Sequence, residues 1–139
     1  MNQQIQQLVK TLVSPSAVSP SARPLRILEI GAGTGGTTAH LLPHIANADY
    51  TFTDISPLLL AKAKTRFSDY PNIAYRQLNI EDSLESQGFE TNHYDLEIAS
   101  NVHHANAEVP QAQENVRSLL ISGGHFVLSA DNQPHVWKE

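Results

Sequence analysis

Residues 25–37 read LRILEIGAGTGGT. An apolar run of strand length, Leu25–Ile30, leads into a glycine-rich turn, and a helical pattern begins at Thr37. Glycine suits such a turn because it adopts unusual dihedral angles and, having no Cβ atom, lets the backbone contact a ligand. The stretch therefore predicts a strand, a ligand-binding loop and a helix in succession. The alternative is a glycine-rich turn that only joins the strand to the helix.

Strand and helix patterns continue to alternate along the chain. The other expected strands are Tyr50–Asp54, Ile73–Leu78, His93–Ala99 and His125–Ser129. The expected helices are Thr37–Leu42, Leu58–Phe67 and Ala112–Ile121, the last closed by Gly123 and Gly124. Alternation of this kind implies right-handed crossovers, and hence an α/β fold with a Rossmann-like, mostly parallel sheet and helices on both faces.

The domain organisation follows from the start of the chain. Residues 1–24 predict an N-terminal helix and a linker rich in Pro and Ser (SPSAVSPSARP), and residues 25–139 predict one folded domain. The 9 Lys and Arg residues are scattered in a chain of net charge −5, so a nucleic-acid partner is disfavoured. The absence of Cys excludes disulfides and thiolate metal sites. No stretch suits a signal peptide or a membrane span, so the expected location is cytoplasmic.

Function in a parallel sheet belongs at the carboxyl ends of the strands. Gly31, Gly33 and Gly36 fit the dinucleotide pattern G-x-G-x-x-G, and Asp54 ends the second expected strand. A carboxylate there can accept hydrogen bonds from both hydroxyls of an adenosine ribose, which NAD and S-adenosylmethionine share. Glu29 favours S-adenosylmethionine, because a carboxylate suits its ammonium and sulfonium charges and repels a pyrophosphate. A solvated carboxylate at the strand end is the alternative for Glu29.

Four spaced segments carry a family resemblance: LEIGAGTGGTTAHLLP, YTFTDISPLLLAKAKTRF, YRQLNIED and YDLEIASNVHHAN. In order and wording they resemble the C-methyltransferase domains of modular polyketide synthases, which are class I S-adenosylmethionine-dependent methyltransferases. The resemblance covers about Leu25 to Val127. It implies S-adenosylmethionine as cofactor, an acyl carrier protein that presents the substrate, and neighbouring synthase domains as partners.

The resemblance also implies roles for residues. The glycine loop would cradle the methionine part of the cofactor, Asp54 would hold the ribose, and Asn79 with Ile80 would face the adenine. The family usually has Asp at the position of Asn79, and Asn can still accept from the adenine amino group through its carbonyl oxygen. The implied cofactor-binding residues are Glu29, Gly31, Ala32, Gly33, Asp54, Ile55, Asn79, Ile80 and Asn101.

His104 matches the histidine of the family and is the candidate catalytic base, while His103 stands where the family has leucine. Family members methylate the α-carbon of a β-ketoacyl thioester on a carrier protein, and an imidazole with a pKa of about 6.5 suits removal of that proton. The alternative is that both histidines are surface loop residues. Asp131 is the nearest candidate for an acid that partners His104.

Several residues have simpler interpretations. His40 and His44 have the spacing of zinc ligands on a helix, but Pro43 is expected to end that helix, so no metal site is predicted. Lys62 and Arg66 share a helix face that could meet an acidic carrier protein, although a solvated helix face is the favoured interpretation.

Two features stand apart from the family pattern. Glu97 lies inside the fourth expected strand, where an unpaired buried charge is costly. Family members have further strands after the fifth, and these are not expected to fit into the last residues of the chain, so a truncated fold with an exposed strand edge is predicted. Two other functions remain open: an O- or N-methyltransferase of another small molecule, and a dinucleotide-binding Rossmann domain.

Overall fold

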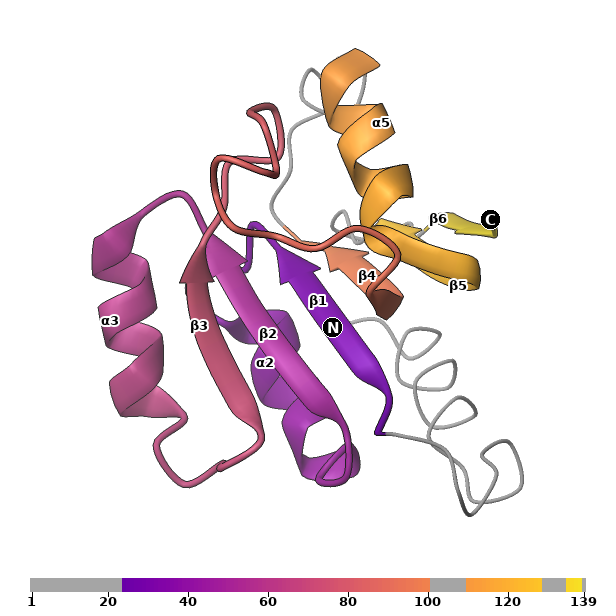
Figure 1. Ribbon diagram of the computed structural model, residues 1–139. Coiled ribbons are helices and arrows are strands. Elements are labelled where there is room, and N and C mark those ends of the chain that lie inside the picture. The colour runs from indigo at the N-terminus through magenta and orange to yellow at the C-terminus, as the bar shows by residue number, and fades with distance from the viewer. Residues whose placement is uncertain (1–23, 101–109, 129–134, 139) are drawn as a thin grey trace.

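The computed structural model describes residues 24–100, 110–128 and 135–138. Six strands in this part of the chain form one sheet in the order β3-β2-β1-β4-β5-β6 (Figure 1). The strands are β1 (Arg26–Ile30), β2 (Asp49–Asp54), β3 (Ile73–Gln77), β4 (Tyr94–Ala99), β5 (Leu120–Leu128) and β6 (His135–Lys138). β1 to β5 pair in parallel and β6 is antiparallel to β5, which confirms the Rossmann-like, mostly parallel sheet.

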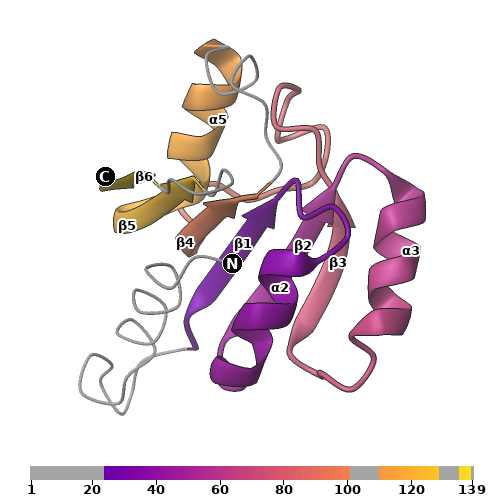
Figure 2. The ribbon, with the colours of Figure 1, turned by 180° about the vertical axis from the view of Figure 1, so that it is seen from behind.

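Helices cover both faces of the sheet, as the alternating pattern predicted. The described helical elements are α2 (Gly36–Leu41), the 3₁₀ turn η1 (Leu42–His44), α3 (Pro57–Arg66) and α5 (Pro110–Leu119). α2 lies behind the sheet in Figure 1 and in front of it in Figure 2. Neighbouring residues of a strand face opposite sides. Accordingly, Ile27 packs in a cluster with residues of α2 and α3, whereas Leu28 packs in a second cluster with residues of α5.

Local sequence signals explain where α3 begins and where α2 ends. The Ser56 hydroxyl caps α3 by accepting from the Leu59 N–H at 3.3 Å, and Pro57 occupies the first turn, where its missing N–H costs nothing. α2 ends at Leu41, and Pro43 lies in the following 3₁₀ turn. The expectation that Pro43 ends this helix is therefore confirmed.

The C-terminal part differs from the expectation in two ways. α5 ends at Leu119 and β5 begins at once, so the two glycines do not close the helix. Instead, Gly123 has a φ of 84° inside β5, where the register with β4 shifts between Tyr94 and Leu96. Extra residues on one strand produce such a bulge, and glycine adopts the left-handed conformation at little cost. Moreover, β6 pairs antiparallel with the edge of β5, so one of the further strands does fit after the fifth and the edge of β5 is covered.

Residues 78–93, between β3 and β4, contain turns and no helix. Their apolar side chains are nevertheless buried against α5 and the sheet, namely Leu78, Ile80, Leu84 and Phe89. The connection is thus an ordered loop held by a core of its own. Residues 1–23 lie outside the described part of the chain, so the proposed domain boundary at residue 24 stays a prediction.

Candidate functional site

The carboxyl ends of the parallel strands meet at one edge of the sheet, which the arrowheads of β1, β2 and β3 mark in Figure 1. The glycine loop follows β1, Asp54 ends β2, and Asn79 comes two residues after β3. Ser100 follows β4, and its N–H donates to the Ile30 carbonyl at 3.0 Å. The topology therefore brings together four of the segments that the sequence singled out.

The glycine loop takes a shape that requires glycine and is attached to β2. Gly31, Gly33 and Gly35 have φ angles of 65°, 62° and 91°, which side chains with a Cβ atom adopt only with strain. The Ala32 N–H donates to the Thr53 carbonyl at 2.9 Å. Because the loop is held from β2, its position is set before any ligand binds.

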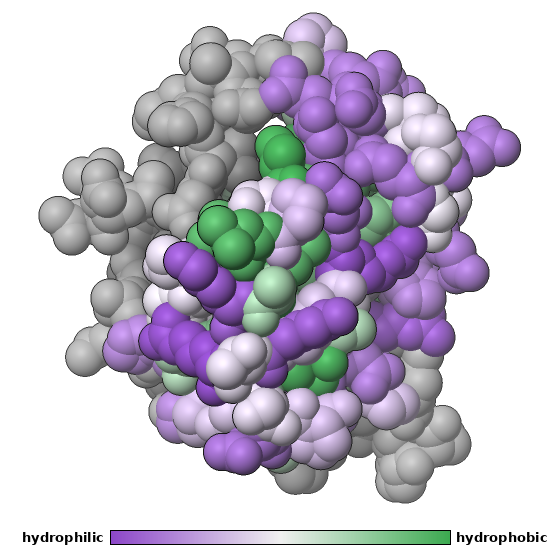
Figure 3. All heavy atoms as spheres, turned by 90° about the vertical axis from the view of Figure 1, so that its left-hand side faces the viewer, coloured by the Kyte–Doolittle hydropathy of each residue, from purple (hydrophilic) through white to green (hydrophobic). Residues whose placement is uncertain are grey.

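Asp54 is the main attachment of this loop. Its Oδ2 accepts from the Gly33 N–H at 2.9 Å, and its Oδ1 accepts from the Ser56 N–H at 3.0 Å. Each carboxylate oxygen can accept more than one hydrogen bond, so both oxygens keep capacity for ribose hydroxyls. Ile55, the next residue, is 57% exposed, and Leu58 at the start of α3 is 64% exposed. Apolar residues accordingly reach the surface on this side of the molecule (Figure 3).

Glu29 is completely buried, at 0% exposure, so the alternative of a solvated carboxylate is wrong. Its Oε1 accepts from the hydroxyls of Thr38 and Tyr50, each at 2.5 Å. Its Oε2 accepts from the Ser100 hydroxyl at 2.5 Å. These hydroxyls come from α2, β2 and the residue after β4, so one carboxyl group connects three elements around the start of the glycine loop.

Burial also changes the acidity of this group. Loss of solvation raises the pKa of the Glu29 carboxyl above its ordinary value, the three hydrogen bonds lower it in part, and the charge of Asp54 raises it further. Burial raises the pKa of the Tyr50 hydroxyl well above its usual range, and the charge of Glu29 adds to this increase. Glu29 therefore faces hydroxyl groups of the protein, and its interaction with a cofactor stays a prediction.

Asn79 and Ile80 belong to a tight turn. The Asn79 Oδ1 accepts from the Glu81 N–H at 3.0 Å, and the Asn79 N–H donates to the Gln87 Oε1 at 2.8 Å. Ile80 is only 7% exposed and lies in the second core cluster. The structure thus brings Asn79 to the site edge and puts most of the Ile80 side chain into the core, and the adenine contact of both residues stays a prediction.

Other predicted residues divide into three groups. Asn101, His103, His104 and Asp131 lie outside the described residues. His40 and His44 are exposed, and the described residues contain no cluster of His, Asp or Glu that could hold a metal ion. Glu97 is 0% exposed in β4, so its expected burial is confirmed.

Lys62 and Arg66, the two α3 residues that the sequence singled out, are both exposed. The Arg66 Nη1 donates to the Thr34 carbonyl at 2.6 Å, and its guanidinium lies 5.1 Å from the centre of the Phe67 ring. In the described part of the chain, Lys62 makes no such hydrogen bond to the glycine loop, and its proposed contact with a carrier protein stays a prediction. The Arg66 contact reaches 32 residues back along the chain, so the sequence contained no signal for it.

Sequence reasoning also missed the partners of Glu29 and two amide side chains, Gln87 and Asn115, that hold the Asn79 turn. Asn115 alone had a readable signal. It is a polar residue on the face of α5 that buries Ala112 and Leu119, and it is itself 5% exposed. A buried polar side chain normally has hydrogen-bond partners, so its position indicates a structural or site role.

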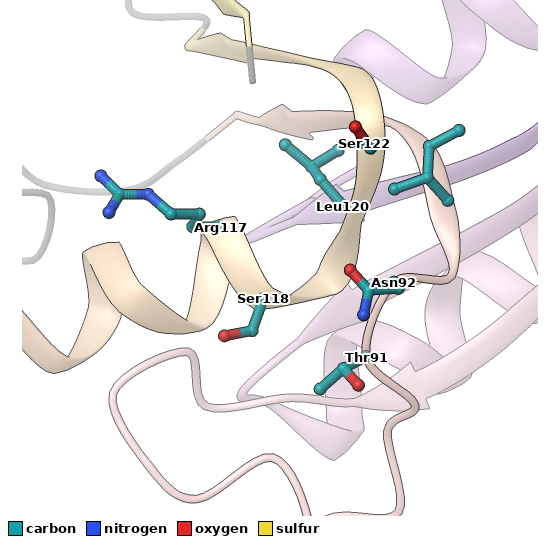
Figure 4. A pocket seen from close by; sticks show the side chains of 7 residues that line it. Thr91, Asn92, Arg117, Ser118, Leu120 and Ser122 are labelled. Atoms are coloured by element: carbon teal, nitrogen blue, oxygen red, sulfur yellow. The ribbon is translucent and has the colours of Figure 1, made fainter.

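A cavity of about 520 Å³ lies elsewhere (Figure 4). It is lined by residues that precede β4 and by residues at the junction of α5 with β5, namely Thr91, Asn92, Arg117, Ser118, Leu120, Ile121 and Ser122. These residues mark the amino ends of β4 and β5, at the edge of the sheet opposite the glycine loop. The cavity is therefore separate from the candidate site.

The helices in the described part of the chain lack the length and apolar character that a membrane span requires.

Known proteins with similar sequence or structure agree with this geometry. Residues 28–126 match the family model described as a methyltransferase domain. The chain is 49% identical over 117 residues to methyltransferase CalH from Penicillium decumbens, covering 79% of this chain and 32% of CalH. It is 43% identical over 111 residues to the highly reducing polyketide synthase GPY1 from Gibberella fujikuroi, covering 75% of this chain and 4% of GPY1.

Solved structures give the same result. The CurJ carbon methyltransferase superposes with a TM-score of 0.84 at 43% identity, covering 96% of this chain and 35% of CurJ. CalH, solved in complex with SAH, superposes with a TM-score of 0.74, covering 89% of this chain and 35% of CalH. The chain thus spans about a third of these two methyltransferases. It belongs to the methyltransferase domain family, with a class I methyltransferase fold, and it is similar to carbon methyltransferases and polyketide synthases, as its four sequence segments predicted.

Proposed function

We propose that the chain binds S-adenosylmethionine at the carboxyl edge of its sheet and acts as a carbon methyltransferase domain of a polyketide synthase. Its substrate would be the α-carbon of a β-ketoacyl thioester, presented by an acyl carrier protein beside neighbouring synthase domains. Family membership supports the methyltransferase activity, and the SAH in the CalH structure supports the cofactor. A cytoplasmic location stays a prediction.

One observation carries the choice of ligand: two carboxyl groups flank the glycine loop. Glu29 is buried beneath the start of the loop, and Asp54 holds the Gly33 N–H. A diphosphate in this loop would meet both negative charges, whereas the ammonium and sulfonium groups of S-adenosylmethionine would be attracted to them. Because Glu29 is enclosed by hydroxyl groups, we infer that it acts on the ligand through its charge rather than by direct contact.

The other implied residues fit the parts of this cofactor. Gly31, Ala32 and Gly33 would leave room for the methionine part, and Asp54 would accept from the ribose hydroxyls. The exposed side chain of Ile55 lies next to Asp54 in the chain and offers an apolar surface to the nucleoside. Asn79 and Ile80 would contact the adenine, and Asn101 would complete the site from the segment after β4.

The chemistry rests on His104. S-adenosylmethionine supplies an electrophilic methyl group when it is bound. The imidazole of His104 would take the α-proton of the substrate, which is acidic because two carbonyl groups flank the carbon. The carbanion electrons would then form the new C–C bond as the S–CH₃ bond breaks and its electron pair stays on sulfur. The protein would mainly align the two reactants.

Calorimetry with S-adenosylhomocysteine and NAD tests the ligand choice. We expect the chain to bind S-adenosylhomocysteine more tightly, because Glu29 and Asp54 disfavour a diphosphate. Glu29→Gln, which removes the buried charge but can keep hydrogen bonds to its hydroxyl partners, should narrow the difference between the two ligands. Equal or tighter binding of NAD by the unmodified chain would overturn the proposal.

His104→Ala tests the base. We expect cofactor affinity to stay nearly intact while methylation of a β-ketoacyl carrier protein falls by about a hundredfold or more. His103→Leu is the matched control and should leave the rate unchanged. Mass spectrometry measures methyl transfer to the substrate, and exchange of its α-proton in deuterated buffer measures proton removal separately. Normal exchange and methylation in His104→Ala would place the base elsewhere, and a product methylated on oxygen or nitrogen would contradict the carbon assignment.

A further inference from the structure

Two amide side chains hold the turn that contains Asn79, one from α5 and one from farther along the same loop. The Asn115 Nδ2 of α5 donates to the carbonyls of Ile80 and Asp82, each at 2.8 Å. The Gln87 Nε2 donates to the Asn79 carbonyl at 3.0 Å, and the Gln87 Oε1 accepts from the Asn79 N–H at 2.8 Å. The backbone of the turn is thus fixed on two sides by side chains that belong to neither end of it.

Asn115 is buried where an apolar residue would be expected. It is 5% exposed and lies on the face of α5 that packs Ala112 and Leu119 into the second core cluster. Burial of an amide group costs free energy unless its hydrogen bonds are satisfied. Here the Nδ2 bonds two carbonyls of the turn, and the Oδ1 accepts from the Gln111 Nε2 at 2.9 Å. Asn115 therefore supports the turn specifically, and not merely the packing of the helix.

The support bears on one atom at the site edge. The Asn79 Oδ1 accepts from the Glu81 N–H inside the turn, and a carbonyl oxygen can accept a second hydrogen bond. The direction of that second lone pair depends on the backbone that Asn115 and Gln87 hold. An adenine has an amino group that can donate to this oxygen, whereas a hypoxanthine presents a carbonyl oxygen at the same position and would be repelled.

We propose that Asn115 is a positioning residue for base recognition: by holding the Ile80 and Asp82 carbonyls, it aims the Asn79 Oδ1 at the amino group of the bound adenine and so sets the preference for adenine over an oxo-purine. This inference rests on the proposed binding of S-adenosylmethionine at this edge. Asn115 touches no ligand in this account. It acts through the turn.

The chain contains a matched control at the opposite edge of the sheet. The Asn72 Nδ2 donates to the carbonyls of Ile45 and Ala48, at 3.0 and 2.8 Å. This is the same chemistry, one amide group holding two loop carbonyls, but it lies just before the amino end of β3. Removal of either amide takes a donor from two carbonyls, so both variants should lose stability for the same reason, although the Ile45 carbonyl keeps the Ala48 N–H as a donor at 3.0 Å.

Calorimetry on the full chain with S-adenosylhomocysteine and S-inosylhomocysteine separates positioning from stability. We expect the unmodified chain to prefer the adenine ligand. Asn115→Ala should bind S-adenosylhomocysteine about tenfold more weakly and lose most of its preference over the inosine ligand, because the acceptor is no longer held in place. Asn72→Ala should keep both the affinity and the preference. Urea unfolding of the two variants provides the comparison of stability.

Each outcome decides the inference. It is overturned if the unmodified chain prefers adenine and Asn115→Ala keeps that preference, and this result would leave the proposed function standing. An unmodified chain that folds but does not bind S-adenosylhomocysteine would overturn the proposed function and the inference together. If Asn115→Ala does not fold, Gln87→Ala tests the turn from its other, half-buried side: loss of the preference supports a held acceptor, and an unchanged preference refutes it.

Discussion

The two edges of the sheet hold acidic side chains in different surroundings. At the amino edge, the His93 Nδ1 lies 3.2 Å from the Glu90 Oε2, and these side chains are 30% and 78% exposed. At the carboxyl edge, Glu29 is wholly buried and its oxygens accept from three hydroxyl groups. Charges in water contribute little to stability, whereas a buried carboxyl group depends on its partners. The carboxyl edge therefore contains a buried carboxyl group with three hydroxyl partners, and it is also where the ligand site is proposed.

Glu29→Leu should have the largest effect on stability, because it removes the buried carboxyl group that distinguishes the carboxyl edge. It leaves the hydroxyls of Thr38, Tyr50 and Ser100 without their acceptor, and each unsatisfied buried group costs about 1–3 kcal/mol. We expect the free energy of unfolding to fall by about 3 kcal/mol or more in urea denaturation at pH 7. Glu90→Ala is the control at the amino edge and should change stability by no more than about 0.5 kcal/mol. Equal losses in the two variants would show that the edges do not differ.

Asp54→Ala should weaken binding of S-adenosylhomocysteine by about 1.5–3 kcal/mol, because hydrogen bonds that involve a charged group have this strength. The variant also frees the Gly33 N–H, which loosens the glycine loop. The matched control is Asp49→Ala at the opposite end of β2, where the side chain is exposed and affinity should not change. Calorimetry measures both. Unchanged affinity in a folded Asp54→Ala protein would rule out its ribose role.

Substitution of two glycines by alanine compares a crowded position with an open one. Gly35 has a φ of 91°, and a Cβ atom there would lie 2.8 Å from the Cε2 of the buried Phe67. Gly123, within the β5 bulge, has a φ of 84° with nothing within 4 Å of a Cβ atom. Both Ala variants bear the cost of the left-handed conformation, about 1–2 kcal/mol. Gly35→Ala should lose about 1 kcal/mol more in urea unfolding, because Phe67 must also move. Equal losses would mean that the Phe67 ring adapts freely.

A change in pH should produce the smallest effect. The free energy of unfolding should vary with pH along a different slope in the unmodified chain than in Glu29→Gln. The folded chain raises the pKa of Glu29, so above the ordinary value of 4.5 the folded state holds a proton that the unfolded state has lost. The stability that this proton contributes is present below pH 4.5 and is lost as the pH rises through the folded pKa. Stability relative to Glu29→Gln should therefore fall over this window. Urea midpoints measured across the acidic range check the sign, and a relative gain in stability with rising pH would contradict it.

The elements that could be predicted from the sequence are those whose start or end is signalled by residues within the same short segment. The strand and glycine pattern of residues 25–37, Ser56 and Pro57 before α3, and Pro43 after α2 are local signals, and the structure has the corresponding elements. The same holds for Asp54, because a carboxylate at the end of a parallel strand lies at the site edge in any such sheet. The four segments also identified the family, because their order and wording are specific to it.

By contrast, the surroundings of those residues depend on how the whole chain packs. Ser100 lies 71 residues from Glu29, and Asn115 lies 35 residues from Ile80, so no local pattern could pair them. The bulge at Gly123 and the pairing of β6 depend on how β5 meets its neighbours, which the period of apolar residues does not record. Local patterns were enough to predict β1 to β5, the helices that accompany them and the residues at the carboxyl ends of the strands. The structure was needed to show which of those residues are buried and which distant side chains hold them. Burial and hydrogen bonding depend on neighbours in space rather than along the chain.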